Sequence, residues 1–487
     1  MTTDTAEVRT YGGWRLSRGI GVGKLDSRQT LAFLVLVGAV TLLTAFGGLR
    51  VGVVTASVAV VVMALLLWRR DGILLIDYVA AAARYRLARA RGETSYRGQV
   101  MNRWPRSATL PGVLATTDLL DVEVPGYGRG GLVWDRRSGL LSSTMLLGTG
   151  GTLLTDHADA ERYVASWGAL LANLADQPAI RWATVTVELT PGDGNALGHD
   201  HASRLDPEAP AFATEVLQVL STSAPGASTR VETRLTVTVD ASYGGIPVRN
   251  LEDGAAQALR VLGVVNPSTA GAEVIRRATA IDLIRMVRTA YDPSARSVSP
   301  TEWDATALTW SDAGPVAAEE MPGEYHHDGA ISVTWALLEA PRQRIAHSVL
   351  LRLLSPGRFP RRVTIAYRVL DREEAGGLLE REMTASDTRA AYRQRTKRDE
   401  NARERRDREL SSAQAEEEAA GAGLVQFSVF VTTTVTDPAD LFRAKAEVEA
   451  AAAGSRLRLR VARFGQSAAF AAGLPCGVYP PYEKSRR

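Results

Sequence analysis

Cysteine is almost absent from this sequence. Cys476 is the only cysteine among 487 residues, so neither an intrachain disulfide nor a zinc site built from cysteines can form. A chain without disulfides agrees with a reducing, cytoplasmic environment for most of its length. No local nucleophile signature surrounds Cys476, and we expect it to be a small packed residue.

Lysine is also scarce. Only four of the 57 basic residues are lysines, and together with the abundance of Ala, Val and Gly this skew suggests a GC-rich coding sequence. A cluster of arginines is therefore weak evidence for a binding site. The net charge of +3 and the aromatic content of 6% do not favour direct nucleic-acid binding, which requires a basic groove with stacking rings.

Sequence motifs for catalysis and nucleotide binding are missing. The segment Gly19–Lys24 superficially suggests a phosphate-binding loop, but Arg18 stands where the first glycine is required and Leu25 follows the lysine. No lipase-type serine motif, zinc-protease motif or kinase motif occurs. We therefore predict a non-enzymatic chain with no catalytic residue, no cofactor and no metal ligand.

Histidines give a weak metal signal. His199 and His201 lie in a Gly-rich stretch, but two ligands two residues apart without a clear third ligand make a poor site. His326 and His327 precede an expected strand, and a turn is the simpler explanation for them.

One long apolar stretch, Leu31–Trp68, dominates the sequence, and its only charge is Arg50. Each half is long enough as a helix, at roughly 27 Å, to cross the hydrocarbon core of a bilayer. Gly47 and Gly48 stand between the halves and indicate a turn. The stretch therefore predicts two transmembrane helices folded as a hairpin.

The flanks of this hairpin predict its orientation. Basic residues crowd both sides, while the tip carries Arg50 alone; they are Arg15, Arg18, Lys24 and Arg28 before it, and Arg69, Arg70, Arg84, Arg86, Arg89 and Arg91 after it. The positive-inside rule then places both termini in the cytoplasm, in a multi-pass protein of the plasma membrane. The first span begins too late, and without a cleavage site, for a signal peptide.

The remainder of the chain predicts an α+β fold. Its second half repeats the rhythm of strands and helices found in its first half, and the order resembles a ferredoxin-like, split βαβ unit interrupted in the middle. The predicted segments are a tail at 1–30, the hairpin at 31–70, a juxtamembrane helix and linker at 71–109, a first α/β subdomain at 110–245, a helical and irregular connector at 246–330, and a second subdomain at 331–487.

Several elements of the second subdomain are predicted individually. We expect strands at 331–339, 362–370, 424–435 and 457–462, and helices at 343–354 and 437–453. Asp437 should cap the second helix, with Pro438 in its first position and Gly454 beyond its end.

A charged insertion at 371–421 separates two of these strands. Its apolar residues are too sparse for a sustained heptad, so we expect a solvated helical hairpin that adds little to a core. Two interpretations remain open, a merely solvated excursion and a partner-binding arm.

The end of the chain carries a resemblance. The stretch from Arg456 to Pro475, in which a strand leads into Gln466, Phe470 and a Leu-Pro pair, resembles the close of the N-terminal region of TraC-like conjugation ATPases. The insertion at 371–421 resembles that region too, and the hairpin is similar to PrgI-like inner-membrane subunits. The whole layout resembles an actinobacterial family of two-helix integral membrane proteins of type IV (conjugal-transfer) secretion systems.

This resemblance implies a structural adaptor within an oligomeric secretion complex. The ATPase family continues into a motor domain, and no Walker loop occurs in this sequence, so the expected partners are a separate secretion ATPase and other membrane subunits. One alternative is an EccE-like component of a type VII secretion complex, which shares the outline. A membrane-bound transferase is a less favoured alternative.

Reporter fusions test the predicted orientation. Because arginines crowd both flanks of the hairpin, fusions at residue 5 and at residue 487 should both report a cytoplasmic location. A fusion at either position that reports an external location would rule out the hairpin topology.

Overall fold

The protein combines two apolar N-terminal helices with a large antiparallel sheet in an α+β fold, as the sequence predicts in outline. The structure is a computed structural model. It describes residues 27–98, 109–124, 128–149, 155–192, 210–223, 229–243, 251–298, 303, 308–341, 343–371, 373–380, 384 and 424–481.

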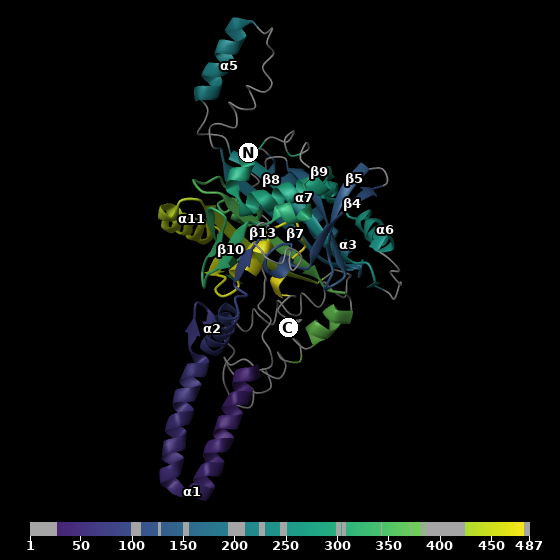
Figure 1. The fold of residues 1–487 in the computed structure, drawn as a ribbon. Coiled ribbons are helices and arrows are strands. Elements are labelled where there is room, and N and C mark those ends of the chain that lie inside the picture. Colours follow the sequence, from purple (N-terminus) through teal and green to yellow (C-terminus); the bar gives the residue numbers. More distant parts are fainter. Residues whose placement is uncertain are drawn as a thin grey trace, which may run out of the picture.

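Helix α1 (Ser27–Leu67) is a hairpin of two apolar arms that extends away from the body of the protein (Figure 1). The arms, Gln29–Gly48 and Arg50–Leu67, have mean hydropathies of 2.2 and 2.3. The helix breaks at Gly48, whose φ of 75° is a conformation that residues with a side chain rarely adopt. Gln29 donates a hydrogen bond to the carbonyl of Leu66 and so ties the open ends of the hairpin together.

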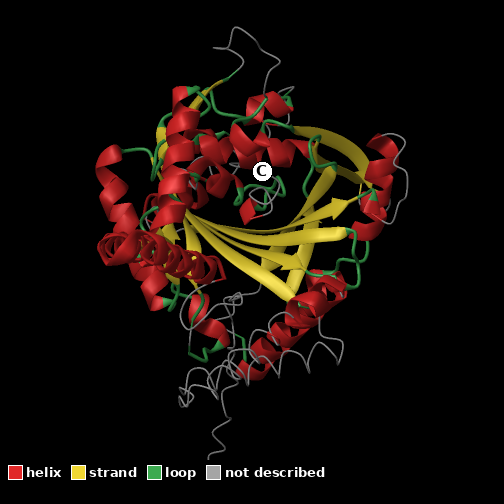
Figure 2. Ribbon diagram, turned by 90° about the horizontal axis from the view of Figure 1, so that it is seen from below, coloured by secondary structure: helices red, strands yellow, loops and turns green. Residues whose placement is uncertain are grey.

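Within the described ranges, thirteen strands form one sheet, and all their pairings are antiparallel (Figure 2). The order along its path is β3-β10-β11-β12-β14-β13-β7-β8-β6-β5-β4, with β15 beside β12 and β9 beside β6. The strands are β3 (Ser95–Arg97), β4 (Thr117–Val124), β5 (Gly128–Asp135), β6 (Leu140–Thr149), β7 (Ile180–Pro191), β8 (Thr229–Asp240), β9 (Ala272–Arg277), β10 (Ala317–Glu320), β11 (Tyr325–His327), β12 (Ala330–Glu339), β13 (Arg361–Val369), β14 (Val425–Val435) and β15 (Arg458–Val461).

The sheet contains two units with the same strand order. In the first unit the neighbours are β9-β6-β8-β7, and in the second they are β15-β12-β14-β13. Counted along the chain, each unit places its four strands in the order fourth, first, third, second. Strands β7 and β13 then pair with each other and join the units. The repeated rhythm seen in the sequence is thus a repeated arrangement in space, and one continuous sheet links the two predicted subdomains.

Hydroxyl pairs across neighbouring strands follow the same repeat. Both units bond a Ser to a Thr and a Thr to a Thr on one face of the sheet, and a further pair lies where the units meet. The pairs are Ser142–Thr238 (2.9 Å), Thr144–Thr236 (2.8 Å), Ser332–Thr434 (2.8 Å), Thr334–Thr432 (2.9 Å) and, at the junction, Thr186–Thr364 (3.0 Å).

Helices cover both faces of the sheet. On the face opposite the hydroxyl pairs, apolar strand residues pack against α3 (His157–Ala175) and α6 (Leu251–Leu262) in the first unit and α11 (Leu441–Gly454) in the second. The hydroxyl face is covered by α7 (Ala280–Tyr291), α12 (Gln466–Ala471) and the segment that follows α12. The paired hydroxyls hydrogen-bond to one another, so they can be buried without losing their hydrogen bonds.

Two predicted helices need correction. The segment 343–354 forms only a short 3-10 helix, His347–Leu350, among its described residues. Asp437 does accept a hydrogen bond from Ala439, but it caps a 3-10 turn, Pro438–Asp440, and the helix α11 itself starts at Leu441 and includes Gly454.

The first turns of the insertion also differ from expectation. Ala375 and Leu379 are buried, and Arg368 of β13 forms an ion pair with Glu374, so 373–380 contributes to the body. The rest of 371–421 lies outside the described residues, except Thr384 and Asp371. An insertion deletion that preserves the fold should therefore begin after Glu380.

Gln466 offers a test of this architecture. Its fully buried amide accepts a hydrogen bond from the backbone N–H of Thr334 at 2.9 Å and donates one to the carbonyl of Thr334 at 3.0 Å, in the gap between β11 and β15. Gln466→Ala leaves that N–H without its partner and should lower the free energy of unfolding by about 1–3 kcal/mol. Gln343→Ala, which removes an exposed contact, is the matched control in denaturant unfolding and should cost less than about 0.5 kcal/mol. Equal losses in the two variants would contradict this role.

Candidate functional site

The region that joins the apolar hairpin to the body is the first candidate site. Two short strands, β1 (Arg69–Arg70) and β2 (Ile73–Leu74), follow the second arm of α1. Asp71 and Gly72 connect them with positive φ angles of 50° and 80°, which is typical of a tight two-residue hairpin. The backbone N–H of Leu75 bonds back to the carbonyl of Trp68 at 2.8 Å, so the next helix starts beside the end of the arm.

That helix, α2 (Leu75–Ala90), lies between the hairpin and the body (Figure 1). It packs on the body through two tyrosines. The rings of Tyr78 and Tyr85 lie 5.3 and 5.5 Å from the ring of Phe464, and the hydroxyl of Tyr85 donates a hydrogen bond to the carbonyl of Glu320. Burial raises the pKa of Tyr85, which therefore stays neutral as a donor. The sequence predicts this helix but does not show which of its faces meets the body.

Both ends of α2 are tied to the body. At its start, Arg463 forms an ion pair with Asp71 at 3.0 Å, and Gly72 leaves no space for a side chain beside Leu338. Beyond its end, β3 pairs with β10 and joins the sheet at its edge. The hairpin is therefore connected to the body through packed elements on either side of α2.

The outer surface of α1 is apolar along its length. None of the apolar window of the first arm is buried, and only 6% of that of the second is. Large apolar side chains point outward from both arms, among them Leu31, Phe46, Val60 and Leu65. Soluble monomers rarely expose apolar surfaces of this extent, so the surface suits contact with a bilayer or with other apolar helices.

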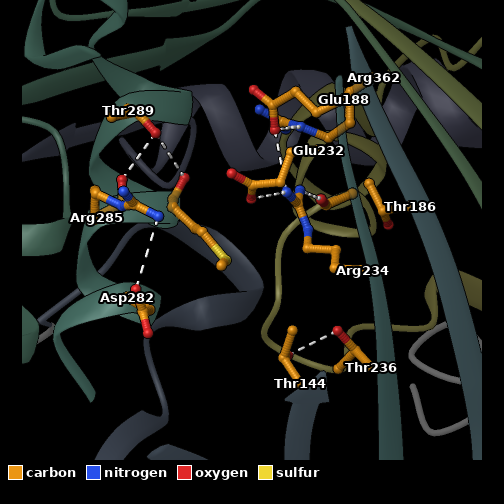
Figure 3. A network of polar contacts seen from close by, with 12 residues as sticks. Thr144, Thr186, Glu188, Glu232, Arg234, Thr236, Asp282, Arg285, Thr289 and Arg362 are labelled. Atoms are coloured by element: carbon orange, nitrogen blue, oxygen red, sulfur yellow. Dashed lines mark hydrogen bonds and ion pairs between the residues drawn. The ribbon is translucent and has the colours of Figure 1, made fainter. Parts of the chain in front are cut away.

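A buried cluster of charged residues lies beside the junction of the two units and is a second candidate site (Figure 3). The carboxylate of Glu188, in β7, forms three ion pairs. Its partners are Arg362 of β13 at 3.3 Å, Arg234 of β8 at 3.2 Å and Arg296 at 3.0 Å. Figure 3 also shows Arg234 reaching Glu232, at 3.4 Å. The residues come from three adjacent strands and the 3-10 helix Pro293–Ser297, and no sequence motif identifies them.

This cluster holds the end of the chain in place. Arg234 donates a hydrogen bond to the carbonyl of Gly473 at 2.7 Å, and the guanidinium of Arg362 lies 5.3 Å from the ring centre of Phe470. Although burial opposes its ionisation, the three arginines hold the pKa of Glu188 far below its usual range. An ionised carboxylate surrounded by arginines is a poor proton acceptor, so the arrangement suits a structural lock better than acid–base catalysis.

His327 and Cys476 take structural places. His327 is buried in β11, donates from Nδ1 to the carbonyl of Tyr291 and accepts from the hydroxyl of Ser332. Burial lowers the pKa of His327 to about 4. Cys476 is buried as predicted, and burial raises its pKa to about 12. His199 and His201 lie outside the described residues.

Among the described ranges, no group of three or more His, Cys, Asp or Glu residues is arranged to hold a metal ion. Comparisons with models of known protein families and with curated protein sequences find no match.

Loss of the negative charge at Glu188 should destabilise the fold. Glu188→Gln leaves buried arginines without their shared anion and should cost about 3–5 kcal/mol in denaturant unfolding. Glu232→Gln, in which the more exposed neighbour is changed, is the control and should cost clearly less.

The same carboxylate gives a pH dependence. Because the pKa of Glu188 is lower in the folded chain than in the unfolded chain, its stabilisation is complete above about pH 4.5 and is lost as the pH falls below that value. The Glu188→Gln variant should lose this part of the acid dependence. An unchanged acid profile in the variant would contradict the assignment.

Proposed function

We propose that this chain is a membrane-anchored, non-enzymatic adaptor of a conjugative type IV-like secretion or DNA-transfer machine, in which it ties a partner ATPase to the inner membrane. The observation that carries the proposal is the apolar hairpin α1, exposed on its outer surface and attached to a folded body by packed contacts. In this proposal α1 spans the bilayer and both termini are cytoplasmic.

The arrangement of the two units supports the resemblance to the ATPase N-terminal region. Strand orders β9-β6-β8-β7 and β15-β12-β14-β13, with α11 between the last two strands of the second unit, are compatible with two ferredoxin-like split βαβ units side by side. The residues that carry the resemblance, Gln466 and Phe470, pack in the core of this assembly. Burial of these two side chains gives a physical reason for the Gln and Phe in the stretch from Arg456 to Pro475.

A partner has limited access to the sheet. A strand of a related unit cannot pair with β12, β13 or β14, because these are interior strands of the sheet. Exposed helices offer other contacts: Phe442 of α11 is 82% exposed, and Phe212 of α5 (Ala211–Ser223) is 77% exposed. Figure 1 shows α5 on the side of the body opposite the hairpin, away from the proposed membrane.

Co-purification tests the adaptor role. The tagged full-length chain, extracted from membranes in mild detergent, should retain a Walker-type ATPase encoded beside it. Phe442→Asp and Phe212→Asp each change an exposed side chain and lie on different helices, so each variant controls for the effect of the other on folding. Loss of the ATPase with only one of the two variants would locate the contact on that helix. An ATPase that fails to co-purify with the wild-type chain contradicts the adaptor role.

A further inference from the structure

Helix α2 presents an apolar stripe on the side that faces away from the body. At about 3.6 residues per turn, its exposed apolar residues fall on one face, opposite the tyrosines that dock on Phe464. Ile76 and Val79 are each 54% exposed and Leu87 is 52% exposed. The stripe comprises Ile76, Val79, Ala80, Ala83, Leu87 and Ala90.

Arginines border this stripe. Arg84 and Arg91 lie on one side of it and Arg86 on the other, all exposed, and Arg91 approaches Glu93 only at 3.8 Å. Asp77 is the single acidic residue of the helix. An apolar face with arginines at its borders is typical of a helix that lies in the interface of an anionic membrane, with its apolar side chains among the acyl chains and its cations at the phosphates.

The position of α2 in the fold matches the expected position of the membrane interface. Its first residue bonds to Trp68, the residue that directly follows the second arm of α1, so the helix begins at the level where the arm ends. The docked tyrosines fix the rotation of the helix and leave the stripe outward. The outward stripe therefore begins close to the end of the apolar second arm, with the exposed Arg69 and Arg70 between them.

The geometry points to α2 as a second membrane contact, an interfacial helix that binds anionic lipid and sets the orientation of the body on the bilayer. The inference rests on the proposed membrane anchoring of α1 and adds to it the lipid class and the contacting residues. Arg84, Arg86 and Arg91 bind headgroup phosphates, while Ile76, Val79 and Leu87 lie below them.

Depth-dependent fluorescence quenching tests this inference on the full-length chain in vesicles. A fluorophore is attached to Leu87→Cys in a Cys476→Ala background, and spin-labelled lipid is the quencher. In vesicles of phosphatidylcholine and phosphatidylglycerol, quenching at Leu87 should exceed that at a Phe442→Cys label on the body by about threefold. Raising the salt concentration should reduce the difference.

Two sets of variants separate charge from position. Replacement of Arg84, Arg86 and Arg91 by Gln should bring quenching at Leu87 close to the Phe442 value, since each arginine shifts the contact equilibrium by about fivefold. Replacement of Arg129, Arg137 and Arg443, which are exposed elsewhere on the body, removes the same charge and should leave quenching unchanged.

A label at Val60→Cys, in the second arm of α1, distinguishes the two proposals. Strong quenching at Val60 with equal, weak quenching at Leu87 and Phe442 would overturn the role of α2 alone. A Leu87 label that is shielded from water but not quenched by lipid would also overturn it, because protein would then cover the stripe. An unquenched Val60 label would contradict membrane anchoring itself.

Discussion

The ladder between β7 and β13 is the interaction on which the rest of the body depends. It joins two units of equal strand order into one sheet, with the Thr186–Thr364 hydroxyl pair on the buried face. Glu188 lies on the same ladder and forms ion pairs with arginines of β8, β13 and the 3-10 helix after α7. A largely buried carboxylate of this kind costs desolvation energy, which its arginine partners on the neighbouring strands offset.

The end of the chain depends on that ladder in turn. Arg234 binds the carbonyl of Gly473, and Gln466 fills the gap beside Thr334 at the edge of β12. The same terminal segment carries Arg463 and Phe464, which hold the turn at Asp71 and the tyrosines of α2. Contacts thus run without interruption from the centre of the sheet to the base of the hairpin, so the body and the proposed membrane anchor behave as one connected structure.

Sequence patterns predict only part of this arrangement. The apolar run of α1 and the alternating strands are local signals, and they predict the hairpin and most strands correctly, whereas Asp437 caps a 3-10 turn and not the predicted helix. Local patterns do not predict that the two units join, because the pairing between β7 and β13 links residues far apart in the chain. The face of α2 that meets the body was also hidden, since tyrosines and aliphatic residues both suit a buried face and only the position of Phe464 decides between them.

The charged cluster was missed for a similar reason. Glu188, Arg234 and Arg362 belong to different strands, and each stands among alternating residues that suggest an ordinary half-exposed strand. In a chain with 53 arginines among its 57 basic residues, nothing in the sequence distinguishes the buried arginines from the rest.

Accessibility of single cysteines on the two sides of the membrane tests the central claim most directly. In a Cys476→Ala background, a cysteine at Arg50, at the tip of α1, should react with a membrane-impermeant maleimide in intact cells. A cysteine at Phe442, exposed on the body, should react only after the cells are permeabilised. Equal reactivity of both sites in intact cells, or reaction at Phe442 alone, would contradict a membrane-spanning hairpin with a cytoplasmic body.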